Sequence, residues 1–82
     1  MNRNSSLSLD LLPPGQTAVV KELRSTGAIR RRLLDIGLVE GTKVTCLYKS
    51  PCGDPIAYLI RSAVIALRAE DSSKIFMEQI PE

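Results

Sequence analysis

The chain has 82 residues, of which 44% are hydrophobic, 24% are charged and 4% are aromatic, and its net charge is +2. A chain of this length forms one small domain with a shallow core, because it buries only about 60% of its unfolded surface. The absence of tryptophan and the low charge argue against a stacking platform or a basic stripe for nucleic acid, and no apolar run approaches the roughly 18 residues that cross a bilayer.

The chain contains no histidine, no phosphate-binding loop of the GxxxxGK[ST] kind and no recognisably spaced pair of acidic residues. Imidazole acid–base catalysis is therefore excluded, and nucleotide hydrolysis by this chain is disfavoured. These absences predict a protein that is not an enzyme and that binds no cofactor.

The only soft metal ligands are Cys46, on a predicted strand, and Cys52, in the loop that follows it. They indicate either a ferrous or zinc site, or a small buried side chain with an incidental loop thiol. A structural zinc site requires four ligands with paired cysteines roughly two to four residues apart, so the spacing favours the second interpretation and no metal site is assigned. Because no signal peptide is apparent, two cysteines indicate a reducing cytoplasm rather than a disulfide scaffold.

The chain opens with a polar stretch, residues 1–6, that we expect to be disordered, so a single domain is predicted over residues 7–82. Leucines then lead to Pro13, Pro14 and Gly15, which cannot continue a helix or a central strand. The leucine segment is either a short extended arm or one helical turn.

About five short β-rich segments are separated by turn residues. They are residues 16–23, 43–49, 56–61, 63–68 and 74–79, with a corner at Ser62 and one helical turn at 70–73. On the segment 43–49, alternation predicts that Val44, Cys46 and Tyr48 share one face. The pattern predicts a mainly β fold, a small and strongly bent antiparallel sheet or barrel. The alternative is a flat α+β sheet with a helix packed on one face.

A short helix is predicted after the first of these strands, where the hydroxyls of Ser25 and Thr26 are suited to capping its N-terminus. Gly37 follows the last apolar residue of the helical pattern, where a left-handed residue commonly ends a helix. Gly41 marks a tight turn before the next strand.

The helix has one apolar stripe. At about 100° per residue, Ile29, Leu33 and Ile36 fall within a narrow arc, which predicts that this stripe faces the core. Arg31 and Asp35 lie one turn apart, at a spacing that permits a weak ion pair.

The basic triplet of residues 30–32 spreads over roughly 200° of the helix, so its side chains cannot all point at one ligand. Leu34 falls between the directions of Arg30 and Arg31, which places a leucine in a basic, solvent-facing surface. This surface is either a solvated face whose side-chain stems cover the edge of the core, or a docking surface for an acidic partner.

The loop over residues 50–55 is dense in turn residues. It is either a rigid hairpin connection or a recognition loop that its two prolines hold stiff. With the helix residues, it completes a candidate partner-binding set: Arg30, Arg31, Leu34, Cys52 and Asp54.

Taken together, four segments resemble the FeoA family, small cytoplasmic accessory proteins of bacterial ferrous iron transport. They are residues 12–16 (LPPGQ), 32–42 (RLLDIGLVEGT), 50–56 (SPCGDPI) and 65–68 (IALR), and the resemblance covers roughly residues 8–79. It implies an SH3-like β-barrel with a helix inserted after the first strand. It also implies a non-enzymatic regulator or assembly factor that docks on the cytoplasmic part of FeoB, the GTP-binding Fe(II) permease, and is not inserted in the membrane itself.

Two positions depart from the usual pattern of that family. Ser62 stands where glycine is common, so we expect a different turn type there, because serine adopts a positive φ less readily. Ser72 stands where alanine is common, which is compatible with a helical turn.

The same barrel occurs in the C-terminal domain of metal-dependent repressors, and an SH3-like regulatory or nucleic-acid-binding module is therefore the alternative function. An exposed edge strand of such a barrel also permits weak self-association.

Overall fold

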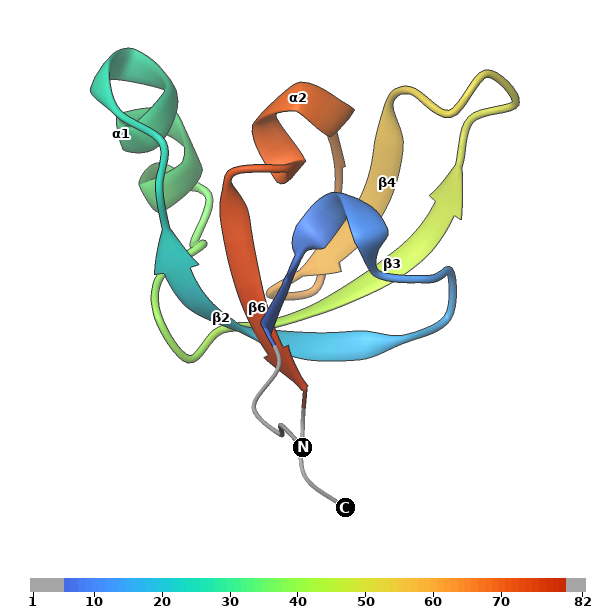
Figure 1. The fold of residues 1–82 in the computed structure, drawn as a ribbon, viewed down its shortest axis with the longest axis horizontal. Coiled ribbons are helices and arrows are strands. Elements are labelled where there is room, and N and C mark those ends of the chain that lie inside the picture. Colours follow the sequence, from blue (N-terminus) through green and yellow to red (C-terminus); the bar gives the residue numbers. More distant parts are fainter. Residues whose placement is uncertain (1–5, 80–82) are drawn as a thin grey trace.

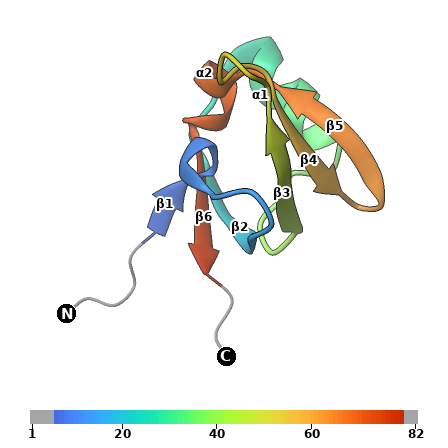
Figure 2. The same ribbon diagram turned by 90° about the vertical axis from the view of Figure 1, so that its right-hand side faces the viewer.

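The computed structural model describes residues 6–79, which form a single bent antiparallel sheet with three short helices (Figure 1). The strands are β1 (Ser6–Ser8), β2 (Thr17–Leu23), β3 (Lys43–Lys49), β4 (Ile56–Ile60), β5 (Ala63–Leu67) and β6 (Ile75–Gln79). Their order in the six-stranded sheet is β1-β6-β2-β3-β4-β5. Strands β1 and β5 therefore lie at the two open edges, as Figure 2 shows.

The predicted strands are all present, with ends that differ by at most about one residue. The leucine segment contains both an extended arm and a helical turn, the two conformations that its sequence allowed. Strand β1 is extended and is followed by the 3-10 helix η1 (Leu9–Leu11). This segment supplies the strand beyond the predicted five. The expected disorder of residues 1–6 falls on residues 1–5, which lie outside the described residues, and on Ser6, which begins β1.

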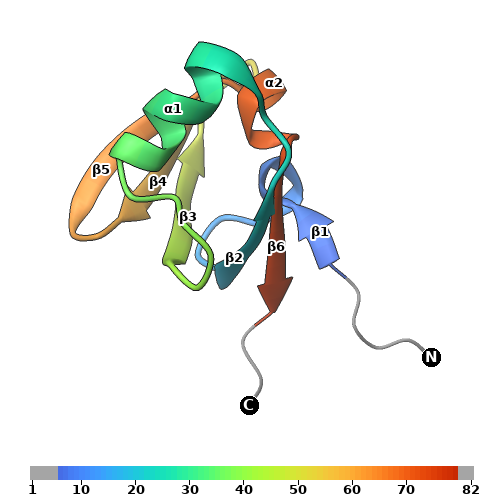
Figure 3. The same ribbon diagram turned by 90° about the vertical axis from the view of Figure 1, so that its left-hand side faces the viewer.

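The remaining helices are α1 (Gly27–Asp35), between β2 and β3, and α2 (Ala69–Ser72), between β5 and β6. Figure 3 shows α1 lying across one end of the curved strands, with β5 at one side and β2 at the other. The strong bend of the sheet excludes the flat α+β alternative. No helix among residues 6–79 is long and apolar enough to span a membrane.

The core fills the inside of the bent sheet. Its largest fully buried side chains are Tyr58, Leu9, Leu33, Leu38, Ile56, Ile60, Ile75, Met77 and Val44. The core also includes Ala18 and Val20 of β2 and Leu67 of β5, so every strand from β2 to β6 contributes to it. The helices η1 and α1 each contribute a buried leucine, Leu9 and Leu33. Burial of this apolar surface is the main term that stabilises the fold.

Strand β3 corrects one prediction. Val44 and Cys46 are buried, but Tyr48 is 60% exposed. The register between β3 and β4 shifts between Cys46 and Tyr48, so the alternation of faces is interrupted there. A bulge of this kind is not visible in an alternating sequence pattern.

The turn between β4 and β5 takes a form that favours glycine, although it contains none. Arg61 and Ser62 have φ angles of 51° and 70°, and Ile60 pairs with Ala63 across a two-residue turn. Positive φ at both central residues is the type I′ conformation, whose twist matches that of the flanking strands. Ser62 thus adopts a positive φ here, contrary to the expectation that serine would avoid it.

Candidate docking surface

Helix α1 begins without the expected side-chain cap. Thr26 occupies the N-cap position with extended φ and ψ, and its carbonyl accepts the Arg30 N–H at 3.4 Å, but its hydroxyl makes no capping hydrogen bond. The Ser25 hydroxyl is buried and has no hydrogen-bond partner among the described residues. The prediction that these hydroxyls cap α1 was wrong.

Helix α1 ends as predicted, shortly before Gly37, which follows its C-cap residue Ile36. The Leu38 N–H donates to the Leu33 carbonyl at 3.0 Å, and the Gly37 N–H donates to the Leu34 carbonyl at 3.0 Å. With Gly37 at φ +102°, this pair of bonds is a Schellman motif. Its usual apolar contact is supplied by Leu33 and Leu38, which are both buried.

The segment after α1 is tied to β2. The Thr42 N–H donates to the Val39 carbonyl at 3.0 Å, which closes the tight turn predicted at Gly41. The Gly41 N–H donates to the Val20 carbonyl at 2.8 Å, and the Val20 N–H donates to the Thr42 carbonyl at 2.9 Å. The far end of α1 is therefore held at a fixed position against the sheet.

The apolar stripe of α1 is only partly buried. Leu33 is 1% exposed and Ile36 is half-buried, whereas Ile29 is 37% exposed. The prediction that Ile29 faces the core was wrong. Leu33 is the only residue of α1 that is buried, so the N-terminal part of the helix stands clear of the core.

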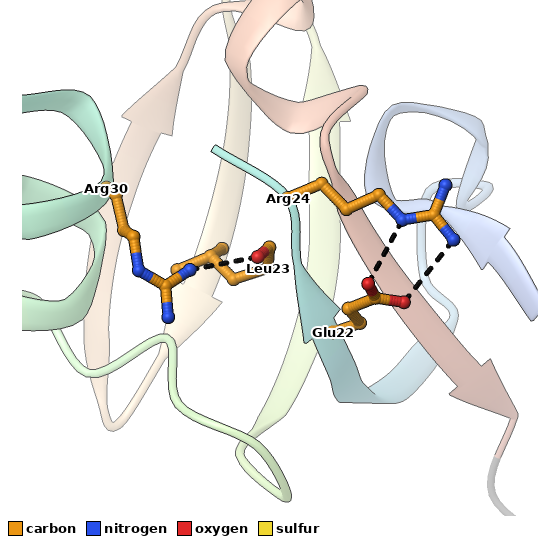
Figure 4. A network of polar contacts seen from close by, with 4 residues as sticks. All are labelled: Glu22, Leu23, Arg24 and Arg30. Atoms are coloured by element: carbon orange, nitrogen blue, oxygen red, sulfur yellow. Dashed lines mark hydrogen bonds and ion pairs between the residues drawn. The ribbon is translucent and has the colours of Figure 1, made fainter. Parts of the chain in front are cut away.

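Arg30 ties the helix to β2. Its Nη1 donates to the Leu23 carbonyl at 2.9 Å, as Figure 4 shows. Nearby, Arg24 pairs with Glu22 at 3.2 Å and lies over the Phe76 ring, 4.2 Å from its centroid. The Arg24–Glu22 pair is the one ion pair among residues 6–79, so the pair expected between Arg31 and Asp35 is not formed.

One surface hollow of about 360 Å³ gathers the predicted helix residues, and we call it the α1 face. It is lined by Gly27, Arg30, Arg31, Leu34 and Asp35. Leu34 is 36% exposed between the two arginines, which confirms its expected position in a basic surface. A second hollow between α1 and β2 adjoins it and shares Arg30 and Leu34.

Arg32 lies on the other flank of α1. With Ile29 it lines a different hollow, which extends to Ala66 at the edge of β5. The triplet is therefore divided between two surfaces, as its angular spread predicted. Sequence reasoning missed Val39, which is 41% exposed and lines the hollow beside β2. The one signal for it is an apolar residue between the turn glycines Gly37 and Gly41.

The loop residues Cys52 and Asp54 do not line the α1 face. Asp54 Oδ1 accepts the backbone N–H of Ala69 at 2.9 Å and so caps the first turn of α2. The Cys52 thiol is exposed and donates to the Asp54 carbonyl at 3.6 Å. Of the five predicted partner-binding residues, the structure brings together Arg30, Arg31 and Leu34.

The two thiols occupy different environments. Cys46 is in the core, where burial raises the pKa of its thiol, whereas Cys52 is on the surface. Residues 6–79 contain no group of three or more histidine, cysteine or acidic side chains placed to hold a metal ion.

A family model described as the FeoA domain matches residues 7–79. The chain is also 35% identical over 74 residues to the Fe(2+) transport protein A/Fe(2+) transporter FeoB fusion protein of Porphyromonas gingivalis. That match covers 90% of this chain and 9% of the fusion protein, so the chain corresponds to a small part of that relative.

Solved structures of other proteins show that the bent sheet is a known fold. The FeoA protein of Chlorobium tepidum superposes with a TM-score of 0.86 at 32% identity, covering 92% of this chain and 71% of that one. The zinc complex of Stenotrophomonas maltophilia FeoA, a procaryotic SH3 domain protein, gives a TM-score of 0.77 at 29% identity, covering 87% and 88%. These likenesses confirm the predicted SH3-like fold.

A manganese-dependent transcriptional repressor in complex with manganese has the same fold over part of its length. Its TM-score is 0.84 at 17% identity, covering 96% of this chain and 39% of the repressor. At that identity the likeness concerns the fold alone.

Proposed function

Because the chain belongs to the FeoA domain family, whose model matches residues 7–79, we propose that it is a non-enzymatic accessory protein of ferrous iron uptake. It acts on the cytoplasmic side of the membrane by contact with the GTP-binding part of a FeoB-type permease. The observation that carries this proposal is the Porphyromonas gingivalis relative, in which an Fe(2+) transport protein A and a FeoB transporter are one fused protein. Fusion keeps two proteins at a high effective concentration, which benefits partners that touch.

The α1 face is the surface that we propose for this contact. It combines an exposed leucine with two arginines, and arginine and large apolar side chains are enriched where proteins dock. The Arg30 guanidinium is already held by the Leu23 carbonyl, whereas the Arg31 guanidinium has no hydrogen bond or ion pair to the rest of residues 6–79. Arg31 is therefore available to an acidic partner, and Leu34 beside it supplies apolar area.

The test measures binding of the full chain to the purified cytoplasmic GTP-binding domain of the permease by calorimetric titration. The double variant Arg31→Glu/Leu34→Glu reverses the charge of the α1 face and removes its apolar centre. We expect binding to weaken by more than about tenfold, which corresponds to roughly 1.4 kcal/mol.

A matched control exists on the same helix. The variant Ile29→Glu/Arg32→Glu makes the same chemical change on the opposite flank, at an isoleucine that is 37% exposed against 36% for Leu34. We expect this control to bind like the wild type. Normal binding by the folded Arg31→Glu/Leu34→Glu variant would refute the α1 face, and absence of binding by the wild-type chain would refute the proposed partner.

A further inference from the structure

Strand β5 is an unprotected edge of the sheet. It lies last in the strand order, next to β4 alone, and its sequence AVIAL contains no charged residue and no proline. Its register with β4 is uninterrupted, and Val64 is 65% exposed. Edge strands are normally shielded from pairing by lysine, proline or a bulge, and β5 has none of these.

The hairpin geometry determines which backbone groups of β5 are unpaired. In a two-residue hairpin the residues that flank the turn form a hydrogen-bonded pair, here Ile60 with Ala63, and the pairs then alternate along the strands. Val64 is opposite Leu59 in a pair that is not hydrogen-bonded, and Ala66 is in the next such pair. The N–H and C=O groups of Val64 and Ala66 therefore point away from β4, toward the open edge.

We propose that a second copy of this chain pairs along this edge, with β5 antiparallel to β5 about a two-fold axis. The register that overlaps all residues of both strands sets Val64 opposite Ala66 of the second copy and places Ile65 on the axis. This register forms about four N–H···O=C bonds between the copies. It is isologous, so it closes as a dimer and does not propagate into fibres.

The charges around β5 select this occupant over a charged strand from another protein. Within β5 an uncharged strand meets an identical uncharged strand, so no charge is buried. At the ends, the register sets Ser62 opposite Arg68 of the second copy, with Glu70 and Asp71 following that arginine in the chain. The hollow of about 530 Å³ at that end of β5 is lined by Arg32 and Arg68 as well as by Glu70 and Asp71, so charges of both signs meet there, and the selection rests on the uncharged strand itself.

This inference is independent of the proposed function, because the α1 face and the β5 edge are different surfaces. The hollow beside β5 is lined by Ile29 and Arg32, whereas the α1 face is lined by Arg31 and Leu34. A β5-paired dimer therefore carries two α1 faces that remain accessible.

The test is sedimentation equilibrium of the full chain, combined with amide hydrogen exchange at each concentration. We expect the weight-average mass to rise toward twice that of the monomer between about 10 µM and about 1 mM, since so small an interface binds weakly. Over the same range, the amide protons of Val64 and Ala66 become protected from exchange. A mass that stays at the monomer value up to about 1 mM overturns the proposal, as does a doubled mass without protection of these amides.

Two variants distinguish a dimer in which the β5 edges pair from a dimer in which the outer faces of the two sheets pack on one another. Val64→Lys places a charge on the open edge at an exposed position, where the fold tolerates it, and we expect the dimer to weaken at least tenfold. Leu59→Lys places the same charge directly opposite, on the same face but one strand inward, and we expect little change. Equal weakening by both variants, or protection of Val64 only when the permease domain is added, overturns pairing with a second copy.

Discussion

Tyr58 is the residue whose surroundings explain most about the core. Its ring is fully buried, and its hydroxyl lies 3.3 Å from the Leu9 carbonyl and 3.2 Å from Ser72 Oγ. One phenol thus connects β4 with η1 and α2. A buried hydroxyl must find such partners to offset its desolvation, which gives a physical reason for a serine at position 72.

Burial raises the pKa of Tyr58 to about 12, and the Ser72 hydroxyl opposes this shift only in part. Because the folded-state pKa exceeds the unfolded value of 10.0, this group contributes stability that is fully present below pH 10.0 and is lost as the pH rises toward about 12. The loss amounts to about 2 kcal/mol. Tyr58→Phe is expected to lower stability near neutral pH but to flatten this alkaline decline, measured by urea unfolding at each pH. An unchanged slope in the variant would contradict the assignment.

Gly37 is required for two separate reasons. Its φ is +102°, and a Cβ built there would lie 2.6 Å from Cδ of Arg61. Gly37→Ala is expected to destabilise the fold by about 2 kcal/mol, from the left-handed backbone and from displacement of the Arg61 stem. The control is Gly41→Ala, since Gly41 has a φ of +92° but open space around its Cβ position. Chemical denaturation compares them, and equal losses would show that the Arg61 contact is unimportant.

At the scale of elements, α2 depends on a residue far from it in sequence. Asp54 caps it by accepting the Ala69 N–H, and the loop before β4 is thereby fastened to the segment that follows β5, at the end of the β4–β5 hairpin away from its turn. Asp54→Ala is expected to cost about 1 kcal/mol of stability, while Cys52→Ser costs little because its thiol is exposed. Thermal unfolding measures both. Loss of permease binding by Asp54→Ala at full stability would instead support a direct docking role for this carboxylate.

The elements divide into those that the sequence predicts and those that it does not. The strands were predictable because the alternation of apolar and polar residues is a local signal, and the C-terminal end of α1 was predictable because Gly37 is one. The cap that Asp54 provides, the outward turn of Tyr48 and the exposure of Ile29 depend on contacts or register between distant segments. Periodicity places Ile29 in the apolar arc, but whether the sheet reaches that turn of the helix is a tertiary matter.

The candidate site was predictable to a similar extent. Angular spacing alone placed Leu34 between Arg30 and Arg31, because all three lie on one helix. The prediction that Cys52 and Asp54 belong to the same surface combined a loop with a helix, and no local pattern in the sequence determines how that loop and that helix are arranged in space. Tertiary contacts instead gave Arg30 a backbone partner and left Arg31 available.

At the scale of the whole molecule, a net charge of +2 conceals an uneven distribution. The arginines of α1 point to two different flanks, so electrostatic attraction to an acidic partner is local. We expect affinity for the permease domain to fall several-fold between about 0.05 M and 0.5 M NaCl, since exposed charges are screened. Arg31→Ala should remove most of this salt dependence, whereas Arg32→Ala should keep it. Equal slopes for the two variants would contradict docking through the α1 face.

The register shift on β3 has a practical consequence for optical work. It leaves one of the chain's two tyrosines, Tyr48, on the surface while Tyr58 stays in the interior, and there is no tryptophan to mask their emission. A soluble quencher such as acrylamide therefore reaches the fluorescence of Tyr48 but not that of Tyr58. Replacing either ring with phenylalanine yields a label-free reporter, one for events on the outer face of β3 and the other for loosening of the interior.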